Sequence, residues 1–311
     1  MKREKGQKKM TSTNFKPATQ QKSGRLYAMV GFLVLLLVFV AVTFFLITKE
    51  SRNEQEWIRL STDLQVHSQQ LAKSVSEAVE GNTSAFVQMG DSTGIIADAV
   101  AALKSGDPLR SLPPLPGAMS DSLADLDRTW NRMNPNAESI LEREKLVLEL
   151  SDASKSFMEV IPRIQELTDE AVRELTRSNA SSNQVFVAGR QLVLSDRILR
   201  HLKEMLRGGA GSVAAADQFK QEIEYFEQTS NALLHGSRSV GVTQVQNSAA
   251  MKALNEARLL FDNARPQLDT VLESSGDILA VRGAADEIFV DSLTLFDISR
   301  GIADSVQFRS G

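Results

Sequence analysis

The 311-residue sequence contains no cysteine, which excludes disulfide bonds, thiolate metal sites and a cysteine nucleophile. Aromatic residues make up only 6% of the chain, and there are just three histidines. His67, His201 and His235 show no recurring metal-ligand spacing with one another or with acidic residues. We therefore expect isolated surface or interface histidines, no metal site and no cofactor.

Sequence signatures of catalysis are also lacking. The glycine-rich stretch 208–212 has neither the lysine nor the preceding strand of a phosphate-binding loop. No segment resembles the strained turn that presents a catalytic serine in hydrolases. We expect no catalytic residues and no enzymatic activity.

Charge is absent from the run between Leu26 and Thr48, which is rich in Leu, Val and Phe. About 20 such residues cross the hydrocarbon core of a bilayer as a helix. The run is too long for the core of a signal peptide, and no small-residue cleavage site follows it. A buried core helix is the alternative, but soluble helices seldom continue this far without a charge. We predict a transmembrane helix at residues 26–48.

The charge distribution predicts the orientation of this span. Residues 1–25 contain eight basic residues and one acidic residue, whereas the whole chain has a net charge of −4. Positively charged flanks remain in the cytoplasm, so residues 1–25 are predicted to be a cytoplasmic tail that is disordered and contacts membrane lipid. The acidic remainder is then periplasmic, on an inner-membrane protein, and should bind no nucleic acid.

Beyond the span, apolar residues recur at helical intervals, as at Leu64, Leu71 and Val75, and no segment alternates like a strand. Two long helices are expected, from Leu26 to about Gly81 and from Asn136 to about Ser178. Pro162 lies inside the second and predicts a kink. The predicted fold class is all-α, with one transmembrane helix followed by an elongated periplasmic helical bundle.

The exported region repeats itself. Residues 64–81 match residues 191–208 at an offset of 127, and residues 123–141 match residues 254–272 at an offset of 131. Chance similarity between helical segments of like composition is the alternative, but glycine and proline positions also agree. The sequence therefore predicts two stacked copies of one helical module.

The module boundaries are predicted at 49–182 and 183–311. Trp130 aligns with Phe261 between the copies, which indicates a core position that both share. Trp57 lies shortly after the span and is interpreted as an interfacial membrane anchor. The proline-rich stretch 106–117 is expected to be an exposed loop at a bundle end, serving as a connector or a partner contact.

The N-terminal anchor, the duplicated helical region and the segment 188–206 together resemble the PilJ family, the methyl-accepting chemotaxis transducers of type IV pili. The residues that carry the motif are Ala188, Gly189, Arg190, Gln191, Leu194, Ser195, Arg197 and Ile198. The first copy departs from it, because Asp63 and Gln70 stand where the second has Arg190 and Arg197.

The resemblance implies a twitching-motility receptor that forms a homodimer in the inner membrane. Such receptors signal through a second membrane helix and a HAMP linker to a methylated hairpin that controls a CheA-type kinase. This chain stops at Gly311, before an expected second span. The CheA-type kinase and its adaptor would therefore be reached only through a cytoplasmic half that is absent here, and the expected periplasmic signal is a pilin or a small anionic ligand.

Arg190 and Arg197 are two helical turns apart and share one face. Across a dimer they would hold an anion such as carboxylate, phosphate or nitrate, which the guanidinium fork binds at two points. The alternative is solvent-facing arginines paired with Asp196 or Glu204. For the chain as a whole, the alternatives are the sensor portion of a nitrate-type histidine kinase and a non-signalling envelope scaffold.

Overall fold

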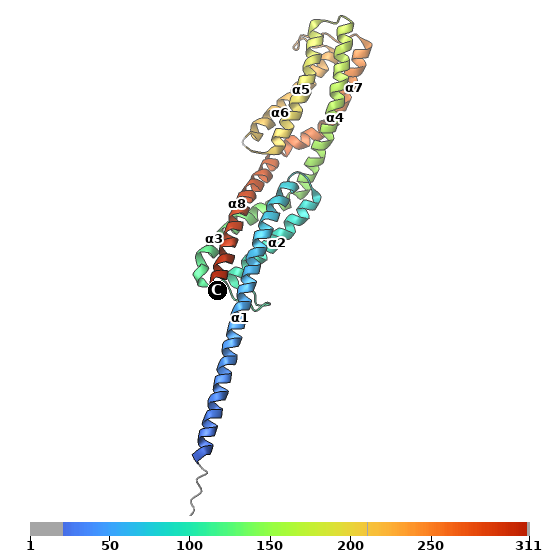
Figure 1. Ribbon diagram of the computed structural model, residues 1–311. Coiled ribbons are helices and arrows are strands. Elements are labelled where there is room, and N and C mark those ends of the chain that lie inside the picture. Colours follow the sequence, from blue (N-terminus) through green and yellow to red (C-terminus); the bar gives the residue numbers. More distant parts are fainter. Residues whose placement is uncertain (1–20, 210, 310–311) are drawn as a thin grey trace, which may run out of the picture. The chain divides into compact units, whose positions relative to one another are not determined.

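The structure, a computed structural model, describes residues 21–209 and 211–309. These residues form eight α-helices and one short 3₁₀ helix, with no β-strand among them (Figure 1). The helices are α1 (Gln21–Ala78), α2 (Thr83–Ser105), α3 (Ser120–Glu142), α4 (Glu144–Arg177), α5 (Ser182–Arg207), α6 (Ser212–His235), α7 (Ser248–Glu273) and α8 (Ser275–Arg309). The predicted all-α fold class is confirmed.

The described residues divide into two compact units, with the boundary between residues 55 and 56. In the first unit, the predicted span lies within α1, and every side chain from Met29 to Phe45 is exposed. Among the helices that the structure describes, this one alone is long and apolar enough to cross a membrane. Residues 1–20 of the predicted cytoplasmic tail lie outside the described residues.

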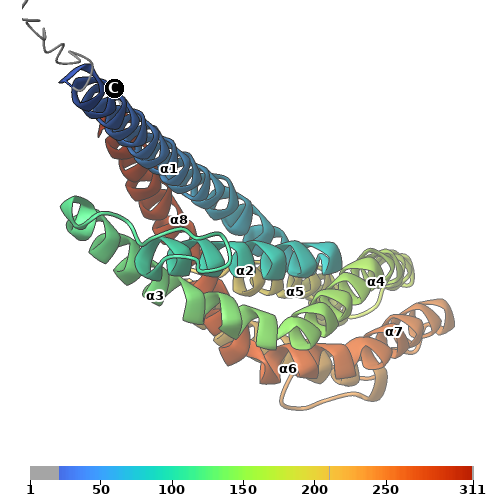
Figure 2. The same ribbon diagram turned by 90° about the horizontal axis from the view of Figure 1, so that it is seen from below.

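The second unit contains two helical bundles. The first bundle consists of the last part of α1 with α2, α3 and α8, whose apolar side chains share one core. The second bundle consists of α4, α5, α6 and α7, with two clusters of buried apolar residues. Seen from below, α8 runs beside the part of α1 that belongs to this unit (Figure 2). The amphipathic faces of the helices meet inside each bundle, which is where most of their stability must arise.

The bundles do not follow the order of the repeats, because each repeat contributes its last helix to the other bundle. α4 follows α3 in the chain but packs against α5 and α7, and α8 packs against α3. The change of bundle occurs near the start of each helix. In α4, Val147 belongs to the first core and Leu150 to the second. In α8 the order is reversed, since Ile278 lies in the second core and Val281 in the first.

The loop between the second and third helices has the same structure in both repeats. Asp107 pairs with Leu112 through an isolated β-bridge after α2, and Ser237 pairs with Val242 after α6, at an offset of 130. Both loops dock on the preceding helix through a backbone hydrogen bond. The Leu115 amide donates to the Leu103 carbonyl, and the Val245 amide donates to the Leu233 carbonyl.

A side chain from the first helix of each repeat holds this loop. The indole Nε1 of Trp57 donates to the Pro113 carbonyl at 3.1 Å. At the equivalent positions, Gln184 Nε2 donates to the Thr243 carbonyl at 3.0 Å. Trp57 is only 7% exposed, so its interpretation as an interfacial membrane anchor is wrong. The indole instead packs in the first core, where its polar nitrogen has a partner.

Two further expectations need correction. The long helix predicted from Asn136 to Ser178 is interrupted at Arg143, so that α3 ends at Glu142 and α4 begins at Glu144. His201 is buried and bonded to Glu222, so it is not an isolated surface histidine. The predicted core position shared by Trp130 and Phe261 is confirmed, because both side chains are buried.

Candidate functional site

A buried polar network lies between α5 and α6 in the second bundle. Gln191 is 2% exposed, and its Nε2 donates to Thr229 Oγ1. Its Oε1 accepts from Ser230 Oγ at 3.1 Å. Both ends of the amide therefore have partners, as a buried polar group requires. This network belongs to the motif that carried the family resemblance, and it fixes the register of α5 against α6.

A second polar cluster lies about two to three turns further along α5. The carboxylate of Glu222, on α6, is almost fully buried. Arg197 Nε lies 2.6 Å from Glu222 Oε1, and His201 Nδ1 lies 2.8 Å from Glu222 Oε2. Two groups from α5 thus meet one buried acidic residue from α6. A buried carboxylate needs such partners, because leaving it unpaired costs several kcal/mol.

The predicted anion-binding arginines both contact α6. The guanidinium of Arg190 lies over the ring of Tyr225, 5.0 Å from its centroid, which is a cation–π contact. Arg197 pairs with Glu222, and not with Asp196 or Glu204. An anion between the two arginines would have to compete with Glu222 for Arg197. Anion binding by this pair stays a prediction.

The junction between the bundles is the second candidate site, at the point where α4 and α8 change bundle. The first helix of each repeat ends there in a glycine with positive φ, Gly81 at +88° and Gly208 at +81°. A Cβ atom at Gly81 would overlap the side chain of Ser151, and one at Gly208 would lie 2.8 Å from the Cβ of Arg282. Both glycines are therefore needed for the turn and for the close approach of the crossing helix.

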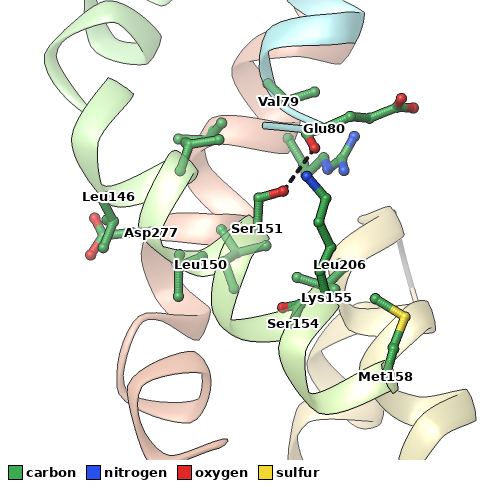
Figure 3. Close-up of a pocket in the computed structure, with 14 residues that line it drawn as sticks. Val79, Glu80, Leu146, Leu150, Ser151, Ser154, Lys155, Met158, Leu206 and Asp277 are labelled. Carbon is green, nitrogen blue, oxygen red and sulfur yellow. Dashed lines mark hydrogen bonds between the residues drawn. The ribbon is translucent and has the colours of Figure 1, made fainter. Parts of the chain in front are cut away.

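A cavity of about 180 Å³ lies at this junction (Figure 3). Its wall is mainly apolar and comes from three helices, α4, α5 and α8, and from the turn after α1. α4 supplies Leu150 and Met158, α5 supplies Leu206, and α8 supplies Ile278 and Val281. Apolar walls with a few polar groups are typical of sites for small molecules.

Three polar side chains give the cavity its chemistry. Ser154 is 2% exposed and its Oγ has no hydrogen-bond partner among the described residues. Lys155 extends from α4 toward Glu80, beside Ser151, as Figure 3 shows. Burial lowers the pKa of the Arg282 guanidinium, and the charges of Glu80 and Asp286 oppose that effect. Arginine stays protonated in proteins, so the cavity holds two cationic side chains.

Of the two acidic residues at the cavity, Asp277 is bonded to Arg143, and Glu80 acts on Arg282 through its charge. Asp277 Oδ1 accepts from Arg143 Nε at 3.3 Å. The backbone carbonyl of Glu80 accepts a hydrogen bond from Ser151 Oγ at 3.0 Å, and Glu80 itself is exposed. In the described part of the chain, neither Lys155 nor Arg282 forms an ion pair with a carboxylate. The cavity therefore combines a mainly apolar wall with one cation, Lys155, that no carboxylate pairs with among the described residues.

No sequence motif marks this cavity, because its lining residues are scattered over 204 positions from Val79 to Arg282. One signal was present in the repeat. Gly81 and Gly208 were aligned at an offset of 127, and an aligned glycine indicates a turn or a close contact. What packs against these glycines became evident only from the positions of α4 and α8.

The chain matches the family described as "Type IV pili methyl-accepting chemotaxis transducer N-term" (PilJ) over residues 46–156 and 174–288. The two matched stretches together cover more than half of the chain, and one falls mainly in each sequence repeat. The chain belongs to this family. The resemblance drawn from the motif on α5 is thereby confirmed.

Two curated relatives agree with this assignment. Protein PilJ of Pseudomonas aeruginosa is 31% identical over 279 residues, which are 90% of this chain and 41% of the relative. The putative methyl-accepting chemotaxis protein AlkN of Alcanivorax borkumensis is 32% identical over 271 residues, 87% of this chain and 39% of the relative. The chain thus spans about two fifths of the length of these relatives. Among the residues that the structure describes, one helix is a candidate membrane span.

Proposed function

We propose that this chain is the periplasmic sensory region, with its membrane anchor, of a receptor that controls type IV pilus motility. The observation that carries the proposal is the shared core of α1 and α8 in the first bundle. Trp57 and Leu60 from α1 belong to the same cluster as Ile302 and Val306 from α8. The helix that continues from the candidate span and the last described helix thus pack together, where a small shift of one against the other could carry a signal.

Because α4 and α8 each pack in the bundle of the other repeat, a change in the second bundle could be transmitted to the pair formed by α1 and α8. α8 begins in the second core at Ile278 and ends in the first core at Val306. A change in packing around the start of α8 would move a single continuous helix of 35 residues. Closely packed helices change between discrete arrangements, so such a movement would be transmitted along the helix.

The partners in this proposal are those that the family suggests. We expect a homodimer, a pilin or a small anionic ligand on the periplasmic side, and a CheA-type kinase reached through the cytoplasmic part of the complete receptor. One face of α1 in the second unit exposes Thr62, Val66, Gln69, Lys73 and Ser76 at alternating spacings of four and three. This is the spacing of a helix that packs along a parallel partner.

Topology is tested with single cysteines, because the natural chain has none. Leu109 is 98% exposed in the loop after α2, so Leu109→Cys should react with a membrane-impermeant maleimide added to spheroplasts. Ser12→Cys, in the basic tail, should react only after lysis. The reverse labelling pattern would overturn the periplasmic assignment.

Function is tested with a chimera. Residues 1–309 would replace the matching N-terminal region of P. aeruginosa PilJ, and surface motility driven by type IV pili would be measured in a strain lacking its own PilJ. Restored motility supports the sensory role. A chimera that reaches the membrane in normal amount and leaves motility absent counts against it and favours a non-signalling scaffold.

Dimer signalling is tested by disulfide cross-linking of cysteines placed singly at Thr62, Val66, Gln69, Lys73 and Ser76 in that chimera. Cross-links that form at these positions and not at buried Leu64 indicate a parallel α1 pair. Their yields should change between cells with retracting pili and cells without pili. Constant yields under both conditions would exclude a movement of α1.

A further inference from the structure

We propose that the junction cavity is a binding site for a small organic acid whose apolar body is about the size of a benzene ring and carries one carboxylate. The cavity is the point where all the helices that link the two bundles meet. This proposal deepens the proposed function, and it rests on that function only for its biological meaning, because binding can be measured separately.

The size and walls of the cavity select the apolar part of the ligand. Its volume is about 180 Å³, and an apolar cavity of about 150 Å³ accommodates benzene. The apolar part of the wall includes Leu150, Met158, Leu206, Ile278 and Val281. The space is too small for a peptide, which favours a free acid with roughly one ring or a short branched chain.

The orphaned hydroxyl of Ser154 indicates that a polar atom belongs inside this cavity. Its Oγ is buried without a partner among the described residues, although buried hydroxyl groups normally have one. Thr168 is also buried on α4, but its hydroxyl has a partner, because Oγ1 donates a hydrogen bond to the backbone carbonyl of Ile164. A carboxylate oxygen in the cavity would accept the free hydrogen of Ser154.

The charges select an acid over an alcohol or an amine. Lys155 and Arg282 line the cavity without an ion pair, and the acidic Asp277 is bonded to Arg143. Glu80 is the remaining acidic residue, and its exposed side chain acts on Arg282 only through its charge. The charges of Glu80 and Asp286 act on Arg282, so Lys155 is the cation that a bound carboxylate would pair with, and it would repel a bound amine.

The position of the cavity makes it suitable for sensing. A ligand there would touch α4 and α8, the two helices that change bundle, and the ends of α1 and α5. It would favour whichever arrangement of these helices closes around it, and its differential affinity would set the size of the shift.

The test measures binding of benzoate to the full 311-residue chain in lipid nanodiscs by isothermal titration calorimetry. Benzamide serves as the neutral probe of the same shape, acetate as the acid without an apolar body, and nitrate as an inorganic anion. We expect benzoate to bind at least tenfold more tightly than each of the other three.

Three variants locate the site. Lys155→Met removes the charge and keeps the stem, and should raise the Kd of benzoate at least tenfold. Lys145→Met is the matched control, because Lys145 is on the same helix, is 89% exposed and lies outside the cavity; it should leave the Kd unchanged. Ser154→Leu fills the cavity and should abolish binding, with circular dichroism as the check of folding.

Three binding results would overturn the proposal. Equal affinity for benzoate and benzamide would exclude recognition of the carboxylate, and an unchanged Kd in Lys155→Met would place binding elsewhere. No binding of any probe at millimolar concentration would exclude the site, even if the chimera restores motility. Binding as expected in a chain whose chimera fails would retain the site and remove the sensory function.

Discussion

The two repeats have the same helices and loops but different interiors between their first two helices. Where the first repeat has Leu64, Ala99 and Val100, the second has Gln191, Thr229 and Ser230. All six side chains are buried. One backbone arrangement therefore accepts either an apolar interior or a fully bonded polar one, because either leaves few buried polar groups without partners.

A second set of positions shows the same contrast. Gln70, Ser74 and Ser92 in the first repeat correspond to Arg197, His201 and Glu222 in the second. Among the described residues, Ser92 Oγ in the first set is buried without a hydrogen-bond partner. In the second set, Glu222 Oε2 is hydrogen-bonded to His201, and Glu222 Oε1 is held by an ion pair with Arg197 alone. We infer that α5 and α6 are held in one specific register, while the end of α1 and α2 depend mainly on apolar packing.

The largest expected effect concerns the aromatic residue that both repeats bury on their third helix. Phe261 stacks on Phe226 with centroids 4.3 Å apart and meets the edge of Phe157. Phe261→Ala should cost about 4 kcal/mol and Trp130→Ala about 3 kcal/mol, because only Phe261 loses aromatic partners as well as buried volume. Urea unfolding followed by circular dichroism measures both.

Phe289→Ala is the control for these substitutions, since Phe289 is 58% exposed on α8; it should change the free energy of unfolding by no more than about 0.5 kcal/mol. A larger loss in Trp130→Ala than in Phe261→Ala would show that the first bundle is the more tightly packed one.

A reciprocal exchange tests the two interiors directly. Leu64→Gln places an amide where the first repeat has no partner for it and should cost about 3 kcal/mol. In Gln191→Leu, Thr229 still donates to the Tyr225 carbonyl, and only the Ser230 hydroxyl loses its acceptor, so the cost should be lower, about 2 kcal/mol. The same urea experiment compares them, and equal costs would mean that the polar network is unimportant for stability.

Removal of the buried Glu222 carboxylate should have the next largest effect on the free energy of unfolding. Glu222→Ala leaves Arg197 and His201 without their partner and should cost about 2 kcal/mol, less than for a fully buried pair because Arg197 is 44% exposed. Ser92→Ala, at the corresponding position, should be neutral within about 0.5 kcal/mol, since its hydroxyl forms no hydrogen bond. A neutral Glu222→Ala would remove the distinction between the two helix pairs.

The smallest effect concerns the side chains that hold the loops. Trp57→Phe removes one bond to a loop carbonyl while keeping most of the packing, which should cost about 1 kcal/mol. Gln184→Met removes bonds to two loop carbonyls and the capping bond to the Ser181 amide, so it should cost about 1 to 2 kcal/mol. Amide hydrogen exchange should become about fivefold faster at Asp107 and Leu112 in the first variant and at Ser237 and Val242 in the second. If either variant also made amide exchange faster in the loop of the other repeat, the two loops would not dock independently on their bundles.

Most of the secondary structure could be predicted from apolar spacing, but the break at Arg143 could not. The residues from Glu142 to Lys145 are all good helix formers, so local preference favours a continuous helix there. The equivalent break at Ser274 is followed by Ser275 and Gly276, which favour an interruption. Aligning the second repeat over the first would have indicated the first break.

The two candidate sites also differ in how far the sequence alone could predict them. The polar cluster on α5 was detectable because Arg190 and Arg197 share a helix face, although their partners Tyr225 and Glu222 were not. The junction cavity was not detectable, because its walls come from residues that only the crossing of α4 and α8 brings together.

The sequence by itself determined the helices, the candidate span, the duplication and the family, because each depends on spacing or similarity along the chain. Only the tertiary structure decided which last helix belongs to which bundle. α4 and α8 present similar apolar residues at an offset of 131, such as Leu150 and Val281 or Ile164 and Leu295. Either helix offers a suitable face to either bundle, so the choice depends on how all the helices pack at once.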